Sequence, residues 1–223
     1  VNRYGTIEQV GQLTAQSVTE AWKRALETAQ VQLIYQGSQG SQEVAEAFRA
    51  GFTSITRRPV DCATLPAKPG EGEVAEQREP MDVNQCKLVM GFKVGVGQGI
   101  EGMAYRLMNA VFGATPHSML FRNVREKLSL CYYCTSSYDR HKGVMLVDSG
   151  VDKDKVEDAK AEIMRQLQLL KNGIFTDQDL DSAKRSMINQ FGTVDDLQST
   201  RSIWYLGQSL DKQMMSAQQA QDM

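Results

Sequence analysis

One short stretch of the chain alternates between apolar and polar residues and two later stretches have the composition of strands. These three stretches limit the possible folds more than any other feature. Every second residue from 86 to 94 is apolar, which predicts a strand with one buried face. The segments 132–138 and 143–149 have the composition of strands and are joined by a short polar turn, which predicts a hairpin. Because helical patterns lie between the first strand and the hairpin, the sequence predicts an α+β fold. We expect a mixed, mainly antiparallel sheet with helices packed on one face.

Helical patterns occupy most of the remaining chain. Apolar residues recur at helical spacing in five places: after Thr14, after Ser41, and across 103–111, 156–170 and 197–210. The spacing Thr176-x-x-Asp179 is that of a capping box, so a further helix is expected to begin there.

Other segments carry more local expectations. Val31 to Tyr35 has the composition of a strand, and Thr115 is placed to cap a helix whose first residue is Pro116. The stretch 59–80 is rich in Pro, Gly and Glu and predicts an extended surface excursion within a single domain spanning 1–223. The sequence does not begin with Met and stops in a Gln-rich helical stretch, so we expect a domain truncated at both ends.

Composition narrows the class of function. The net charge is −2, 41% of residues are hydrophobic and the basic residues are scattered, so neither nucleic acid nor a membrane is an expected partner. No leader peptide is visible, and the four cysteines are too few for a disulfide scaffold. These features predict a soluble protein of the reducing cytoplasm.

The segment from Gly97 to Gly102 fits the dinucleotide-binding pattern G-x-G-x-x-G. In such sites a helix N-terminus and loop N–H groups hold a pyrophosphate within a parallel βαβ unit. The residues about 20 positions on, 115–128, have a helical pattern where the second strand would be required. A glycine-rich turn is therefore the favoured interpretation.

The spacing Cys131-x-x-Cys134 has two possible functional interpretations, which are half of a tetrahedral zinc site and a redox-active pair. A structural zinc site needs about four ligands, and a redox pair normally begins a helix. Here the pair begins a predicted strand, in which residues three apart point to opposite faces. Two unrelated, packed thiols are the expectation.

The two histidines, His117 and His141, belong to no recognised metal motif. A catalytic zinc site needs about three protein ligands and a base, and these two side chains lie 24 positions apart. We expect no metal site and no cofactor in this chain, and no catalytic residues.

Arg125 and Tyr132 are the candidate substrate-binding residues. Arg125 is predicted near the end of a helix and Tyr132 at the start of the adjoining strand. The guanidinium has five donors in a fixed plane and the phenol carries a hydroxyl on a rigid ring, so the two could hold the carbonyl groups of an extended peptide. The simpler alternative is that Arg125 pairs with Glu126 and Tyr132 only packs.

Residues 120–127, LFRNVREK, and residues 130–132, LCY, closely resemble the segment LF-x-x-(V/I)-REK-x-x-L-x-Y of the insulinase/pitrilysin metallopeptidases. The sequence of residues 116–118 and 124–133 resembles that of bacterial members that are encoded as a pair, one partner of which lacks the zinc motif. The resemblance covers most of the chain.

The resemblance implies the C-terminal, metal-free half of a clam-like peptidase. In that family the first domain carries H-x-x-E-H with its zinc, and the second projects an arginine and a tyrosine, seven positions apart, toward the peptide. Arg125 and Tyr132 match that spacing. The implied partners are a zinc-bearing domain or homologous subunit and a peptide substrate, with zinc only in that other domain. The alternative is a catalytically inactive scaffold subunit of a paired peptidase complex.

Overall fold

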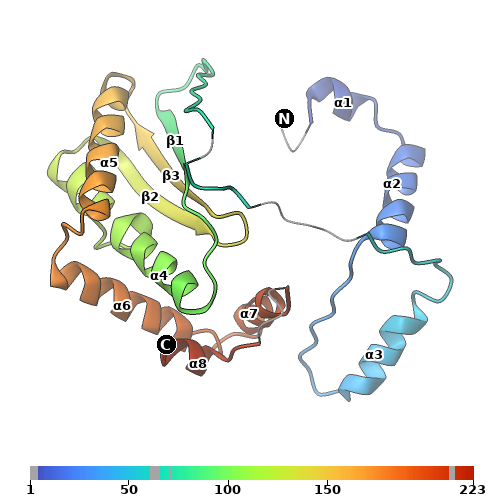
Figure 1. The fold of residues 1–223 in the computed structure, drawn as a ribbon. Helices are drawn as coiled ribbons and strands as arrows, with labels where there is room; N and C mark the ends of the chain where they lie inside the picture. Colours follow the sequence, from blue (N-terminus) through green and yellow to red (C-terminus); the bar gives the residue numbers. More distant parts are fainter. Residues whose placement is uncertain (1–4, 61–65, 71, 211–213) are drawn as a thin grey trace. The chain divides into compact units, whose positions relative to one another are not determined.

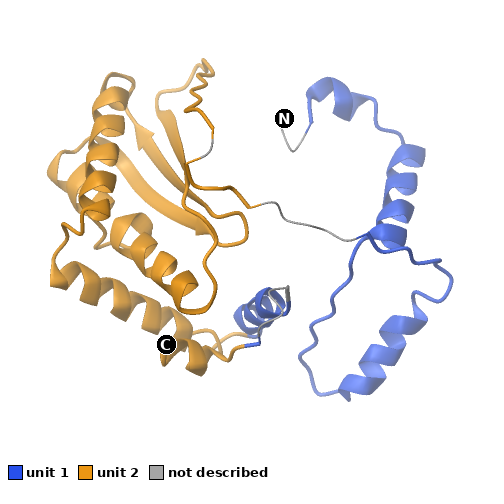
Figure 2. Ribbon diagram, viewed as in Figure 1, with its two compact units in different colours: residues 1–63, 198–214 blue, residues 64–197, 215–223 orange. Residues whose placement is uncertain are grey.

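The structure of the protein, a computed structural model, describes residues 5–60, 66–70, 72–210 and 214–223 (Figure 1). The chain divides into two compact units (Figure 2). Unit 1 comprises Val1–Ala63 and Gln198–Met214, and unit 2 comprises Thr64–Leu197 and Met215–Met223. The sheet and both candidate site residues belong to unit 2.

Unit 2 is built on an antiparallel sheet. Its strands are β1 (Cys86–Lys93), β2 (Cys131–Asp139) and β3 (Val144–Val151), in the order β1-β3-β2. Lys93 pairs with Val144 and Asp139 pairs with the same residue from the other side, so the three strands are in register at this end. The α+β class, the strand and the hairpin predicted from the sequence are confirmed.

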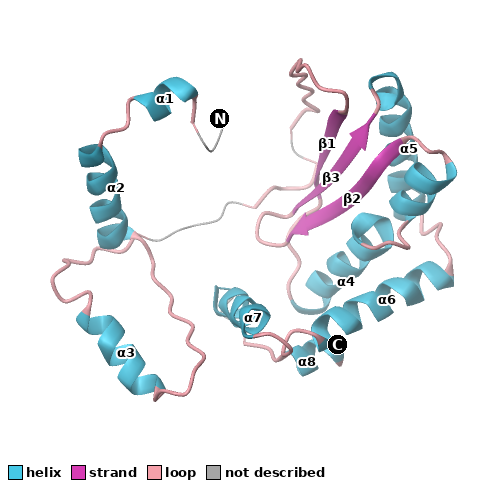
Figure 3. Cartoon of the chain, turned by 180° about the vertical axis from the view of Figure 1, so that it is seen from behind, coloured by secondary structure: helices cyan, strands magenta, loops and turns pink. Residues whose placement is uncertain are grey.

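Helices cover one face of this sheet. Those that contact the sheet are α4 (Gly99–Asn109), η1 (Ala110–Ala114), η2 (Phe121–Lys127) and α5 (Val156–Lys171). The short η3 (Lys153–Lys155) leads into α5, α6 (Asp177–Gly192) packs against η1 and α4, and α8 (Ala217–Gln221) packs against α6. Seen from opposite sides, Figures 1 and 3 show α4 and α5 against the same face. The core between them and the sheet contains Phe112, Leu120, Val124, Cys134, Met145, Val147 and Ile163. The alternating burial along β1 follows from this arrangement, because every second side chain points to the helices.

The β2–β3 turn is closed by side-chain and backbone bonds. One carboxylate oxygen of Asp139 accepts hydrogen bonds from the backbone N–H groups of residues 141 and 142, each at 3.0 Å. Gly143 follows with φ of +65°, a conformation that favours glycine. Its carbonyl oxygen accepts from the N–H groups of residues 94 and 95, at 2.9 and 3.0 Å. The turn therefore also anchors the end of β1.

The helix expected to begin at Pro116 begins later. Pro116 and His117 form a turn, and the backbone N–H of Phe121 donates to the Ser118 hydroxyl at 3.4 Å. Thr115 instead donates its hydroxyl to the carbonyl of Ala110 at 3.2 Å. Thr115 thus closes the preceding helix, and Ser118 takes the capping position because its oxygen reaches the free N–H groups. By contrast, the capping box of Thr176 and Asp179 and the glycine stop at Gly173 (φ +71°) are confirmed.

Unit 1 consists of helices. They are α1 (Ile7–Gly11), α2 (Ala15–Thr28), α3 (Ser41–Ala50) and α7 (Gln198–Leu210). The strand expected from Val31 to Tyr35 is wrong, since this segment is extended but pairs with no strand among the described residues. A strand forms only where a second one supplies its hydrogen bonds.

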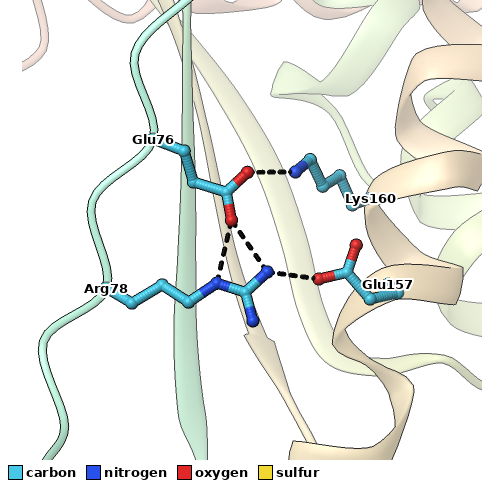
Figure 4. Close-up of polar contacts among 4 residues, drawn as sticks. All are labelled: Glu76, Arg78, Glu157 and Lys160. Carbon is cyan, nitrogen blue, oxygen red and sulfur yellow. Dashed lines mark hydrogen bonds and ion pairs between the residues drawn. The ribbon is translucent and has the colours of Figure 1, made fainter.

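The excursion before β1 is tied to α5 by charged side chains (Figure 4). Glu76 bonds Lys160 at 2.6 Å and Arg78 at 2.8 Å, and Arg78 also bonds Glu157 at 2.8 Å. All four side chains are well exposed, so we assign them a role in positioning the segment and little net stability. The described part of 59–80 contains no helix or strand, as the sequence predicts.

A partly buried chain of polar side chains joins η2 to α5. Arg165 donates to both carboxylate oxygens of Glu162 at 2.8 Å, and Gln166 donates to the same carboxylate at 2.6 Å. Asn123 of η2 donates to Gln166 at 3.0 Å. The bonds from Arg165 lower the pKa of Glu162 against the opposing effect of burial. The segment that carries Arg125 is thus held by an ionised carboxylate two links away.

Replacing Glu162 by Gln is expected to lower the free energy of unfolding of unit 2 by about 1.5 kcal/mol at pH 7, since hydrogen bonds to a charged group are lost. A carboxylate with a lowered folded-state pKa stabilises the fold above its unfolded value and loses this effect as the pH falls through the folded value. The difference between variant and wild type should therefore shrink below about pH 4.3. Amide hydrogen exchange in β3 measures it. An equal difference at pH 7 and in strong acid would contradict this assignment.

Candidate functional site

Arg125 lies on the exposed side of η2, a segment anchored by the buried side chains of Leu120 and Val124. Its guanidinium carbon is 4.6 Å from the centre of the Phe121 ring, and its Nη1 is 3.6 Å from Oε1 of Glu126. The side chain is 40% exposed. The pairing with Glu126 is present, as the simpler alternative expects, but an exposed pair at this distance holds the arginine weakly.

Arg122, one turn earlier, is used differently. It makes an ion pair of 2.5 Å with Asp179, whose side chain is only 8% exposed. Asp179 also accepts from the backbone N–H of Thr176 and so caps α6. Arg122 therefore joins η2 to α6, and of these two arginines it is Arg125 that keeps the weaker protein contacts.

Tyr132 is the extra residue of a β-bulge. Cys131 pairs with Val151 and Tyr133 with Gly150, so Tyr132 has no partner of its own in β3. The residue is 59% exposed. Bulges redirect side chains and are frequent beside functional sites. The bulge is thus the local reason why the Tyr132 side chain does not follow the regular in-and-out alternation of β2.

The Tyr132 hydroxyl donates to Oδ1 of Asp152 at 2.8 Å. This bond raises the pKa of Tyr132 and is the first cause of the lowered pKa of Asp152. A phenol oxygen that donates one hydrogen bond still accepts another. In this state Tyr132 can receive a peptide N–H, and it can donate to a peptide carbonyl only after leaving Asp152.

Two residues at this position were not predicted from the sequence. Asp152 follows β3 directly, and Lys155 lies in η3. Lys155 pairs with Asp152 at 3.3 Å and also donates to the carbonyl of Ser129, at 3.3 Å. Ser129 has φ of +50°, a rare value for a residue other than glycine. Lys155 therefore links the turn before β2 to the Tyr132–Asp152 pair.

The interactions described for the two candidate residues lead to different partners. Arg125 contacts Phe121 and Glu126, and Tyr132 contacts Asp152. The pKa of Cys131, the neighbour of Tyr132, is lowered chiefly by its hydrogen bond with Cys134, and the charge of Arg125 adds a smaller effect in the same direction. Both side chains are on the surface of one unit, and their meeting on a single ligand stays a prediction.

The expectation that Cys131 and Cys134 point to opposite faces is wrong. Both pack against the core cluster, Cys134 buried within it and Cys131 at its edge. The bulge at Tyr132 adds one residue and so returns Cys131 to the inner face. All three described cysteines, these two and Cys86, are free thiols.

The Gly97–Gly102 segment forms a tight strand-to-helix connection. A Cβ atom on Gly97 would lie 2.8 Å from the backbone N of Gly102, and one on Gly102 would lie 2.7 Å from the Gly97 carbonyl oxygen. The preceding strand β1 pairs antiparallel with β3, whereas the dinucleotide motif belongs to a parallel βαβ unit. These glycines serve close backbone packing.

Metal-binding groups are dispersed in unit 2. His117 lies in the turn before η2 and His141 in the β2–β3 turn. The described residues contain no group of three or more His, Cys, Asp or Glu side chains that could hold a metal ion. None of the helices in the described ranges is both long and apolar enough to span a bilayer.

Comparison with known proteins identifies the family to which this fold belongs. Residues 12–187 match the family model of the Peptidase M16 inactive domain. Probable inactive metalloprotease YmfF of Bacillus subtilis (strain 168) is 32% identical over 189 residues, which are 83% of this chain and 44% of that protein. A conserved protein from Enterococcus faecalis V583 has a solved structure that matches 98% of this chain and 52% of its own, with a TM-score of 0.85 and 25% identity. A protease from Helicobacter pylori matches over 94% of this chain and 52% of its own, with a TM-score of 0.70 and 18% identity.

Unit 2 is thus the α+β part of a metallopeptidase-type domain. The chain belongs to the family of Peptidase M16 inactive domains, and the resemblance to the insulinase/pitrilysin family is confirmed. The chain spans about half the length of the relatives that it matches, 44% of one and 52% of another.

Proposed function

We propose that this chain is the metal-free half of an M16-type assembly and that it holds extended peptide through Arg125 and Tyr132. It would work opposite a zinc-bearing domain of the same protein or of a partner subunit. The free thiols suit a reducing compartment, so the proposal places it in the cytoplasm.

The observation that carries this proposal is the contrast between the arginines. Arg122 is tied to a nearly buried carboxylate, whereas among the residues that the structure describes Arg125 contacts an aromatic ring and a distant, exposed carboxylate. A guanidinium presents several donors in one plane and is suited to peptide carbonyl or carboxylate groups. An exposed Arg125 therefore has binding capacity that the fold leaves unused.

Tyr132 supplies the second contact in the proposal. The bulge directs the phenol outward, and Asp152 holds its hydroxyl in a defined orientation. A ring with few rotatable bonds loses little entropy on binding. Two contacts from a helix and a strand would position the peptide backbone and add rate through orientation.

A scaffold without peptide-binding activity is the second candidate. The name of the Bacillus relative describes a probable inactive metalloprotease. The engagement of the Tyr132 hydroxyl with Asp152 also fits a purely structural role, since the bond joins β2 to the segment after β3. In a scaffold, changes at these two positions would leave peptide binding unaffected.

In the full-length protein, Arg125→Ala is expected to weaken binding of fluorescein-labelled β-casein, an unfolded polypeptide, about tenfold or more, the range of a lost positioning contact. Tyr132→Phe should also weaken this binding, because it removes the hydroxyl that contacts the peptide and keeps the ring. Fluorescence anisotropy measures both affinities.

Arg122→Ala is the matched control, because it removes the same charge from the same segment. It should reduce stability through the lost Asp179 pair and leave the casein affinity within about twofold of wild type. Equal affinities for the wild type and the Arg125 and Tyr132 variants would favour the scaffold.

A further inference from the structure

The bulge at Tyr132 brings two cysteines to a spacing that a regular strand does not allow. Cys131 faces Val151 and Cys134 faces Ser149, so three residue steps in β2 match two steps in β3. Two steps in a strand cover about 6.7 Å, whereas three cover about 10 Å. A disulfide requires Cα atoms about 4.4–6.8 Å apart and Cβ atoms about 3.5–4.5 Å apart. The bulge places the Cα atoms at the upper edge of the first range, and the two side chains must draw together for the bond to form.

The two thiols interact and have different environments. Cys134 is buried, with 4% of its surface exposed, whereas Cys131 is half-buried at the edge of the core. A hydrogen bond from Cys134 lowers the pKa of Cys131 to about 7, against the effect of burial, with smaller contributions from Ser149 and Arg125. The same bond and burial raise the pKa of Cys134. Cys131 is therefore the nucleophile of the pair and Cys134 the resolving thiol.

We propose that Cys131 and Cys134 are a site of reversible oxidation by hydroperoxides, and that their disulfide changes the position of Tyr132. The first half rests on the strand geometry together with the different environments of the two thiols. The second half rests on the proposed function, since it makes peptide binding depend on the state of the two thiols.

The chemistry needs only a hydroperoxide as oxidant. The Cys131 thiolate attacks the terminal peroxide oxygen, the S–O bond forms, the O–O bond breaks, and the leaving oxygen takes a proton. The Cys134 sulfur then attacks the Cys131 sulfenic acid, the S–S bond forms, and the S–O bond breaks. The departing hydroxide combines with the Cys134 proton as water. Two thiols lose two electrons and the peroxide gains them.

Tyr132 lies inside the ring that this disulfide would close. The bond shortens the Cα separation, and the only unpaired residue that can absorb the contraction is the bulged one. Its hydroxyl is 2.8 Å from Asp152, a distance that tolerates little movement before the hydrogen bond is lost. Oxidation is therefore expected to release or redirect the phenol.

The test treats the full-length protein with hydrogen peroxide, blocks the remaining thiols with N-ethylmaleimide and maps the peptides by mass spectrometry. We expect an internal Cys131–Cys134 link that dithiothreitol reverses. Cys134→Ser should stop at a Cys131 sulfenic acid that dimedone traps, and Cys131→Ser should leave Cys134 free for the maleimide. Cys86→Ser is the matched control, because Cys86 faces Val151 from the other side and should not affect the link.

A link between Cys86 and Cys131, or a Cys134 that is still fully alkylated in oxidised wild type, would overturn the site. The anisotropy of labelled β-casein, measured on reduced and oxidised protein, tests the consequence. If the link forms and Tyr132→Phe weakens binding while oxidation does not, the coupling is wrong and the proposed function stands. If the link forms and binding is unaffected by oxidation, by Tyr132→Phe and by Arg125→Ala, the proposed function fails and only the oxidation site survives.

Discussion

Gly143→Ala is expected to reduce the free energy of unfolding of unit 2 by about 3 kcal/mol or more. A Cβ atom at this position would lie 2.7 Å from the backbone carbonyl carbon of Gly95 and 2.9 Å from its oxygen. The residue also has φ of +65°, which strains any side chain. Backbone strain and overpacking each contribute about 1–3 kcal/mol, and here neither can relax without separating β1 from the hairpin.

Gly173→Ala provides the matched control. Gly173 has a similar φ of +71° but no atom within 4 Å of its added Cβ, so it isolates the conformational strain from the collision. This variant should lose only about 1 kcal/mol. The slowest amide exchange in β3 measures both, since Trp22 and Trp204 lie in unit 1 and their fluorescence reports on the other unit. Equal losses in the two variants would show that the close approach to Gly95 has no energetic importance.

Elements whose signals are local were predictable from the sequence. The alternation along β1 depends on one buried face, and the capping box at Thr176 and the stop at Gly173 depend on a few neighbouring residues. The start of η2 was misplaced because Thr115 and Ser118 are both good capping residues. The backbone conformation of 115–118 determines which of the two caps the helix, and the sequence does not show it.

The bulge at Tyr132 was not predictable because it is a property of a pair of strands. Which residue is extra depends on the register with β3, and the sequence of β2 alone carries no record of it. The misplaced faces of Cys131 and Cys134 follow directly from this. Only part of the candidate site could be predicted from the sequence. Arg125 and Tyr132 matched a family pattern, whereas Asp152 was identified only by its contact with the phenol in the structure.

In unit 1 the sequence pattern predicted a helix correctly but did not predict the burial of its apolar face. The apolar stripe of α2 was recognised as helical, yet Trp22 on that stripe is 63% exposed and α2 buries none of its residues. The extended segment 31–35 likewise has no paired strand in the described part of the chain. Periodicity states that a face can be buried, but it does not identify what buries it.

Deleting Tyr132 is expected to leave unit 2 folded and to weaken β-casein binding by the full-length protein about a hundredfold. Without the extra residue, Cys131, Tyr133 and Cys134 would pair one to one with residues 151, 150 and 149, which is a regular antiparallel ladder. The change in the free energy of unfolding should stay within about 1 kcal/mol, because every remaining side chain keeps its face. The phenol is lost and the turn that joins η2, which carries Arg125, to β2 shifts. Misplacement of this kind has large effects on bound substrates.

Deleting Thr135 is the control that separates the bulge from chain length. Thr135 lies in the regular part of β2, opposite Asp148, between two inward side chains. Its removal forces either Cys134 or Ser136 off the core face, so unit 2 should lose stability by several kcal/mol. Circular dichroism and amide exchange distinguish the two deletions before binding is measured. If the Tyr132 deletion unfolds the sheet as the Thr135 deletion does, the bulge is a structural requirement and its role in presenting a peptide-binding phenol is wrong.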